Sequence, residues 1–141
     1  LDARLAHAEM SVGAVKGVEI GDGFEAAKAV GSVNNDDFCR NADGTIGKRT
    51  NHSGGILGGM SDGSPVVLRA AFKPTPSISR PQQTVNRAGE EVETVIKGRH
   101  DPIIVPRAVV VVETMAAFTA ADLMLQNAVA KLDNVRKVYE R

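Results

Sequence analysis

The sequence predicts an α+β fold in which helices cover an antiparallel sheet, and three observations support this class. The chain opens with a helical period, continues with two pairs of strand-like segments joined by turn residues, and closes with a long apolar stretch. Strands that follow one another as hairpins favour an antiparallel sheet packed with helices over alternating parallel units. Since 43% of its 141 residues are hydrophobic and 24% are charged, we expect residues 1–141 to form a single globular domain.

The first element is expected to be a helix over residues 1–11. Apolar residues recur there at spacings of four, three and four: Leu1, Leu5, Ala8 and Val12. Because this helical spacing already includes the first residue, we expect the chain to be a fragment of a longer protein. A strand over 14–20 follows, ended by the turn residues 21–23, and a short helix is plausible over 24–30.

Residues 31–53 are polar, rich in Asn, Asp and Gly, and without a period. Loops of this length in compact domains are usually lids, binding loops or disordered segments. We therefore expect a mobile loop over 31–50. The single cysteine, Cys39, lies within it, cannot form an internal disulfide, and is interpreted as an ordinary loop thiol.

Two hairpins are predicted next. Asp62-Gly63 separates the apolar runs 55–60 and 65–72, and Asp-Gly tolerates the positive φ that tight turns require. The prolines of 73–77 then break the second strand. A second hairpin is expected from 84–87 and 92–97, which flank Ala88-Gly89.

The last element is predicted to be a long buried helix over 105–131, followed by a charged, solvent-facing end at 133–141. The most apolar stretch contains Arg107, Glu113 and Asp122, which argues against a membrane span. No targeting segment is recognisable. The 17 basic and 17 acidic side chains cancel, which argues against a nucleic-acid or membrane-surface binder.

Two segments are candidates for binding an anion. The glycines of Gly54–Gly59 could expose backbone N–H donors to a ligand, or they could serve tight strand packing. Lys73, Thr75 and Ser77 alternate along a proline-stiffened loop, where an ammonium and two hydroxyls could hold a phosphate. A solvated loop explains the same residues.

A third candidate is the polar turn formed by Arg99, His100 and Asp101. Arginine pairs with carboxylate or phosphate, and an aspartate beside cationic groups stays ionised and could accept protons. An Arg–Asp pair that pins the turn is an equal alternative. Arg107 and Glu113 lie in the apolar stretch, where a charge needs a partner or a cavity, so structural ion pairs are expected. Arg107 could also face the same anion as Arg99. The three histidines have no metal-ligand spacing, so no metal is expected.

Read together, these motifs resemble the chorismate synthase family. Four ordered runs carry the resemblance: 13–21, 51–59, 73–77 and 98–102, with Arg107-Ala108-Val109 leading into the final helix. The family fold that this implies is a β-α-β sandwich, of which the chain would form the C-terminal part.

The resemblance also implies an activity. The family eliminates phosphate from 5-enolpyruvylshikimate 3-phosphate to give chorismate, a step of aromatic amino-acid biosynthesis that requires reduced FMN. Members are cytoplasmic homotetramers, and some reduce their own flavin with NADPH. Both ligands carry phosphate, which fits the cations, hydroxyls and glycine amides found above.

Matched residue by residue, the resemblance implies a set of FMN contacts: Gly13, Ala14, Gly58, Lys73, Pro74, Thr75, Pro76, Ser77 and Arg99. It implies that Asp101 manages a proton at the flavin, and that Arg99 and Arg107 bind substrate. Gly13 stands where some members have Asn, so the contact expected there is one of backbone. Pro76 stands where some members have a small polar residue, and it carries no hydroxyl.

The family's two catalytic histidines and several substrate-binding arginines have no counterpart in this chain. We therefore expect no turnover by the chain alone. The alternative is a structural or oligomerisation piece of the same fold that no longer binds FMN.

Overall fold

A computed structural model describes residues 1–140 and confirms the α+β class, with helices and four small antiparallel sheets. The elements in chain order are α1 Asp2–Met10, β1 Val15–Ile20, the 3-10 helix η1 Gly23–Lys28, α2 Gly31–Asn34, β2 Phe38–Arg40, β3 Ile46–Lys48, β4 Ile56–Leu57, β5 Met60–Ser61, β6 Leu68–Phe72, β7 Gln82–Val85, β8 Glu91–Thr94, α3 Val105–Ala128 and α4 Leu132–Tyr139. The strands pair two by two instead of forming one continuous sheet.

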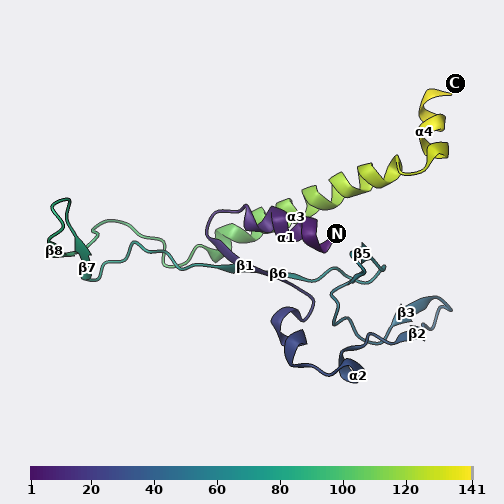
Figure 1. Cartoon of the computed structure of the whole chain (residues 1–141), viewed down its shortest axis with the longest axis horizontal. Helices are drawn as coiled ribbons and strands as arrows, with labels where there is room; N and C mark the ends of the chain where they lie inside the picture. The colour runs from purple at the N-terminus through teal and green to yellow at the C-terminus, as the bar shows by residue number, and fades with distance from the viewer. Residues whose placement is uncertain (141) are drawn as a thin grey trace.

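The packed part of the molecule consists of α1, α3 and the β1–β6 pair, which lie together at the centre of Figure 1. Three of the four buried hydrophobic residues found in the described chain come from these elements, namely Leu5 on α1, Val15 on β1 and Ala108 on α3, and the fourth is Ile56 on β4. Leu5 and Glu9 are the buried residues of α1, and their spacing of four places them on one face of the helix. The predicted first helix and the predicted strand over 14–20 are thereby confirmed.

The partner of β1 is β6, which lies far away in the sequence. The two strands pair antiparallel with Val15 opposite Phe72 and Ile20 opposite Leu68. Just beyond the pair, the Gly21 N–H donates to the Val67 carbonyl at 3.0 Å. The segment that connects β1 to β6 therefore begins and ends at the same edge of the strand pair, so its two ends are neighbours.

The predicted hairpin around Asp62-Gly63 was wrong. The turn lies at Gly58-Gly59 instead, with Leu57 opposite Met60 in the short β4–β5 pair. Gly58 and Gly59 have φ of 55° and 79°, and two successive residues with positive φ form the two-residue turn that suits a hairpin.

Residues 31–53, expected to lack regular structure, contain α2 and the β2–β3 hairpin, in which Phe38 lies opposite Lys48. These elements are three or four residues long, too short for a period to be visible in the sequence. The mobility of 31–50 stays a prediction. The second predicted hairpin is confirmed by β7 and β8, which form the end of an extended arm in Figure 1.

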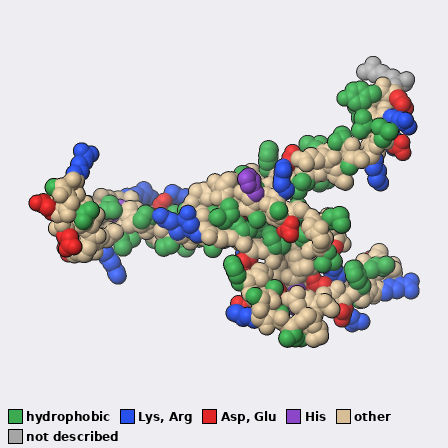
Figure 2. All heavy atoms as spheres, viewed as in Figure 1, with side chains coloured by type: hydrophobic (Ala, Val, Ile, Leu, Met, Phe, Trp, Pro, Cys, Tyr) green, Lys and Arg blue, Asp and Glu red, His purple; other side chains and the backbone are tan. Residues whose placement is uncertain are grey.

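The final helix is present, but the prediction that it is buried was wrong. Only Ala108 and Thr119 of α3 are buried, although the helix is long and apolar enough to cross a membrane by length and composition. Within residues 1–140, α1 is the one element that packs extensively against α3, so most of the surface of α3 is open, as the hydrophobic side chains along it in Figure 2 show. Large exposed side chains of α3 are Val105, Val109, Val110, Val111, Phe118, Met124 and Leu125. The end of the chain is exposed as expected, with no buried residue in α4; Arg141 lies outside the described residues.

Candidate functional site

The pairing of β1 with β6 joins two of the predicted FMN-binding segments. The Lys73 N–H donates to the Ala14 carbonyl at 2.9 Å, directly beyond the end of the strand pair. Ala14 has a φ of 72°, a left-handed conformation that non-glycine residues seldom adopt. Beside it, Gly13 leaves open space, since a Cβ added there would meet nothing within 4 Å.

The Lys73–Ser77 segment presents its side chains alternately. Lys73, Pro74 and Pro76 are exposed, whereas Thr75 and Ser77 are half-buried. The Thr75 Oγ1 atom is buried and has no hydrogen-bond partner within the described part of the chain. Because buried hydroxyls are nearly always paired, this atom marks a place where a further group can accept or donate a hydrogen bond.

The glycine run divides into two parts with different roles. Gly54 and Gly55 are buried, and a Cβ would come within 2.4 Å of the Gly21 nitrogen or 2.6 Å of the Pro65 carbonyl oxygen. Gly58, by contrast, is exposed, and a Cβ there would meet nothing within 4 Å. Tight packing therefore explains Gly54 and Gly55. At Gly58 the backbone is accessible to a ligand.

The third candidate turn is held by an ion pair that the sequence did not assign. Arg107 Nη1 lies 2.7 Å from Asp101 Oδ2, while His100 Nε2 contacts the Ile96 carbonyl at 3.1 Å. Asp101 is thus paired with an arginine, but with Arg107 and not with Arg99. Both partners are accessible, with side-chain exposures of 39% and 75%.

The structure does not join these candidate segments into one cavity. No hydrogen bond or ion pair found among residues 1–140 links Arg99 to Gly58 or Lys73. None of these three residues lines any of four cavities found among residues 1–140. What the structure brings together is Ala14 with Lys73, and Asp101 with Arg107.

A buried polar cluster was missed by the sequence analysis. It consists of Asp36, Lys48 and Asp62, whose side chains are only 4%, 3% and 10% exposed. Lys48 Nζ donates to Asp62 Oδ2 and lies 3.8 Å from Asp36 Oδ2. We call these three residues the Asp–Lys–Asp cluster.

Asp36 also receives four hydrogen bonds. The Thr50 hydroxyl and the His52 N–H donate to one oxygen, each at 2.7 Å. The Ser53 N–H and hydroxyl donate to the other oxygen, at 2.9 and 2.5 Å. Burial disfavours the charged form, but the bonds from Ser53, Thr50 and His52 outweigh it and hold the pKa of Asp36 well below its ordinary value. The carboxylate is therefore ionised at neutral pH.

Little in the sequence could have revealed this cluster. Its members lie 12 and 14 residues apart, on no common helix or strand. The density of Asp, Asn, Ser and Thr over residues 34–53 was the one usable signal, because polar side chains crowded into turns bond to backbone.

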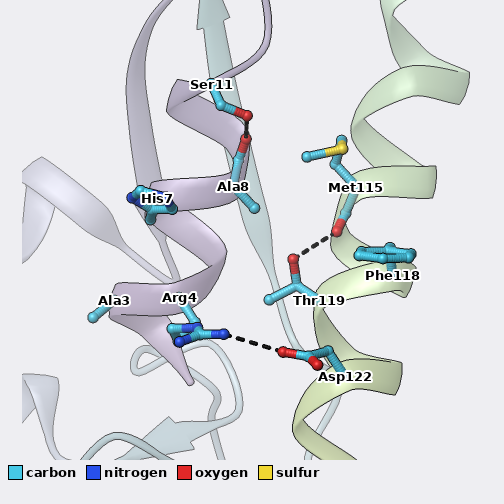
Figure 3. A pocket seen from close by; sticks show the side chains of 9 residues that line it. All are labelled: Ala3, Arg4, His7, Ala8, Ser11, Met115, Phe118, Thr119 and Asp122. Carbon is cyan, nitrogen blue, oxygen red and sulfur yellow. Dashed lines mark hydrogen bonds and ion pairs between the residues drawn. The ribbon is translucent and has the colours of Figure 1, made fainter.

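The largest of these cavities lies between α1 and α3 and has a volume of about 600 Å³ (Figure 3). Arg4 and Asp122 form an ion pair across it at 3.1 Å. The Thr119 hydroxyl is bonded within its own helix, to the Met115 carbonyl at 2.8 Å. None of the predicted site residues lines this groove, and its walls are largely apolar.

Comparisons with known proteins agree with one another. The family model described as chorismate synthase matches residues 1–125. A chorismate synthase of Lachnoclostridium phytofermentans is 64% identical over 141 residues, which are 100% of this chain and 38% of that protein. One of Archaeoglobus fulgidus is 61% identical over 126 residues, covering 89% of this chain and 35% of that protein.

A solved structure, described as the crystal structure of chorismate synthase, matches with a TM-score of 0.68 and 35% identity. That match covers 99% of this chain and 34% of the other. The chain therefore spans between a third and two fifths of the length of the relatives it matches.

Proposed function

The chain belongs to the chorismate synthase family, and we propose that it carries part of the site where a complete member binds reduced FMN. The reaction proposed for the complete protein is the elimination of phosphate from 5-enolpyruvylshikimate 3-phosphate, in the biosynthesis of aromatic amino acids. Cytoplasmic location, assembly as a homotetramer and a link to NADPH belong to the same proposal and rest on the family alone.

The observation that carries the proposal is the buried, unpaired Thr75 hydroxyl beside Lys73. A hydroxyl that lacks a partner among residues 1–140 fits a flavin, since FMN offers a phosphate, a ribityl chain and ring oxygens as acceptors. The open backbone at Gly13 and Gly58 leaves room for close approach. These residues therefore fit the group that the family requires.

Each residue has a definite task in this proposal. Gly13, Ala14 and Gly58 offer backbone to the cofactor, and Lys73 to Ser77 offer one ammonium and two hydroxyls. Arg99 contributes a guanidinium to cofactor and substrate anions. Bound FMN would supply electron density to the C–O bond that breaks.

Asp101 and Arg107 are proposed to act on the proton and on the substrate. Their ion pair supports this assignment in a specific way, because Arg107 keeps the carboxylate in place while both groups stay accessible. An arriving substrate carboxylate would compete with Asp101 for Arg107 and free the aspartate to accept a proton.

A titration of the purified chain with FMN, followed by flavin fluorescence, tests the proposal. Lys73→Ala and Arg99→Ala should each weaken binding about tenfold or more, because each removes a charged hydrogen bond worth about 1.5–3 kcal/mol. Lys137→Ala on α4 and Arg87→Ala at the β7–β8 turn remove the same charges elsewhere and should leave the affinity unchanged.

The second candidate is a structural piece that supplies oligomer contacts without binding FMN. The exposed apolar surface of α3 favours it. A folded circular-dichroism spectrum with no saturable FMN binding would decide for this second function.

Turnover is expected to need more than this chain. We propose that the chain alone has no chorismate synthase activity, because it spans at most two fifths of its relatives' length. Measurable release of phosphate from the substrate by the isolated chain with reduced FMN would overturn that statement.

A further inference from the structure

The Asp–Lys–Asp cluster lies at both flanks of the glycine hairpin. Asp36 accepts hydrogen bonds from His52 and Ser53, directly ahead of Gly54. On the other side, the Asp62 N–H donates to the Gly55 carbonyl at 3.1 Å. Lys48 connects the two aspartates, so one ammonium links the polypeptide before the hairpin with the polypeptide after it.

The hairpin needs such an external support. Glycine has the largest conformational freedom of all residues, and Gly54, Gly55, Gly58 and Gly59 all take positive φ. The short β4–β5 pair offers few ladder bonds to hold them. The backbone around Gly58 would therefore sample many conformations unless its flanks were fixed.

The cluster is suited to that task because its side chains are buried and each of its charged groups has a partner. A hydrogen-bonded network of low exposure has one favourable arrangement, since any other leaves a charge without a partner. Lys48 and Asp36 both come from the 31–50 segment, which was expected to be a mobile loop. Their contacts tie that segment to the hairpin.

We propose that Asp36 and Lys48 are positioning residues, which fix the glycine hairpin so that its accessible backbone at Gly58 can hold an anionic ligand. This inference rests on the proposed function, in which Gly58 is a contact of FMN. In this proposal the 31–50 segment holds the glycine hairpin in one conformation, and we call this support the brace. Neither residue needs to touch the cofactor.

Hydrogen–deuterium exchange tests the brace without any ligand. The amides to follow are those of Gly54, Gly55 and Ile56, which are bonded to Asn51 and Ser53. In Asp36→Asn these amides should exchange about tenfold faster or more, since at least one charged hydrogen bond is lost. Amides of β1 and α1 should keep their rates.

The matched control is Asp43→Asn, in the turn of the β2–β3 hairpin that follows Asp36. Asp43 is bonded only locally, to Thr45 at 2.6 and 2.9 Å. If Asp36→Asn does not fold, Thr50→Val removes a single bond to Asp36 and should give a smaller increase at the same amides. Unchanged exchange at Gly54, Gly55 and Ile56 in a folded variant would overturn the inference.

FMN affinity separates positioning from stability. Lys48→Met should weaken FMN binding about tenfold and lower the melting temperature. The double variant Lys48→Met/Asp62→Asn removes one of the carboxylates left unpaired, so the melting temperature should partly recover while the affinity stays low. Recovery of both together would mean that the cluster acts only on stability.

The two proposals fail in different ways. If the unaltered chain binds no FMN, the proposed function fails, and the exchange rates alone decide whether the brace exists. If the unaltered chain binds FMN and Asp36→Asn binds it equally well, the positioning inference fails while the proposed function stands.

Discussion

Two regions of this molecule reverse the usual distribution of polar and apolar side chains. Between residues 36 and 64, three charged side chains are at most 10% exposed. In α3, by contrast, Val110 is 61% exposed and Phe118 is 72% exposed. The first region is satisfied by partners within the chain. The second has apolar surface for which residues 1–140 supply no cover.

The difference separates what this chain can complete alone from what it cannot. A buried charge requires all its partners at hand, or it shifts its pKa or unfolds the site. An apolar helix of 24 residues requires only a surface to pack on, and a surface can come from elsewhere. The chain's relatives are more than twice as long.

The largest expected effect comes from removing the central cation of the polar region. Lys48→Met leaves Asp36 and Asp62, two carboxylates of low exposure, without the cation that they share. The free energy of unfolding from urea titration should fall more than for any other substitution proposed. Arg136→Met removes a charge from the exposed pairs of α4 and should change it by less than about 1 kcal/mol.

A charge placed on the apolar region should act on association and hardly on stability. Phe118→Asp alters a side chain that is already exposed, so urea denaturation should change little. If α3 associates with another copy, the loss of one buried aromatic ring is worth about 1.5–3 kcal/mol, or about tenfold to a hundredfold in dissociation constant. Sedimentation velocity over a concentration series measures it, and Phe24→Asp on η1 is the control.

Glu9 is the exception to the comparison, a buried acid without a partner. Its side chain is inaccessible, and both carboxyl oxygens lack hydrogen bonds within the described residues. Burial raises the pKa of Glu9, so the folded state prefers the neutral acid. The folding stability that depends on neutral Glu9 is fully present below the unfolded pKa of about 4.3. It is lost as the pH rises through the folded pKa of Glu9.

Glu9→Met should therefore stabilise the chain at pH 8 by about 1–3 kcal/mol, the cost of an unsatisfied buried group. The gain should shrink towards pH 4, where Glu9 is neutral. Urea denaturation of both proteins at each pH gives the difference. A gain that is the same at pH 4 and pH 8 would contradict the raised pKa.

The smallest expected effect has opposite signs for stability and binding. Thr75→Val removes the unpaired hydroxyl, which should raise the free energy of unfolding by up to about 1 kcal/mol. FMN affinity should fall about fivefold, because one neutral hydrogen bond is lost. Ser79→Ala, just beyond the segment, is the control. An unchanged affinity would remove Thr75 from the proposed site.

The sequence predicted the local elements well and the distant contacts poorly. Helix α1, strand β1 and the β7–β8 hairpin follow from periods and turns that are visible within a dozen residues. The pairing of β1 with β6 could not be predicted in this way, since no property of residues 15–20 identifies a partner strand about fifty residues further along the chain. Two turn signals competed near residue 60, and Gly58-Gly59 prevailed because both its residues take positive φ without strain.

The candidate site shows the same division. The motifs carrying Lys73, Thr75 and Asp101 were found from the sequence, whereas the partners of Asp101 and Asp36 were not. Spacing does not reveal contacts made through loops, and the three-residue strands of the 31–50 segment leave no period. The burial of α3 was mispredicted because composition indicates that a surface is apolar but not which chain covers it.

The closure of the β1–β6 pair has a practical consequence. Because Ile20 lies opposite Leu68 and the Gly21 N–H meets the Val67 carbonyl, residues 22–66 form an insertion whose two ends are neighbours. A genetic deletion of that insertion, sealed with an Asn-Gly linker, would turn the two strands into an ordinary hairpin. The excised part contains the whole Asp–Lys–Asp cluster, so it is a natural unit for transplantation into a related scaffold.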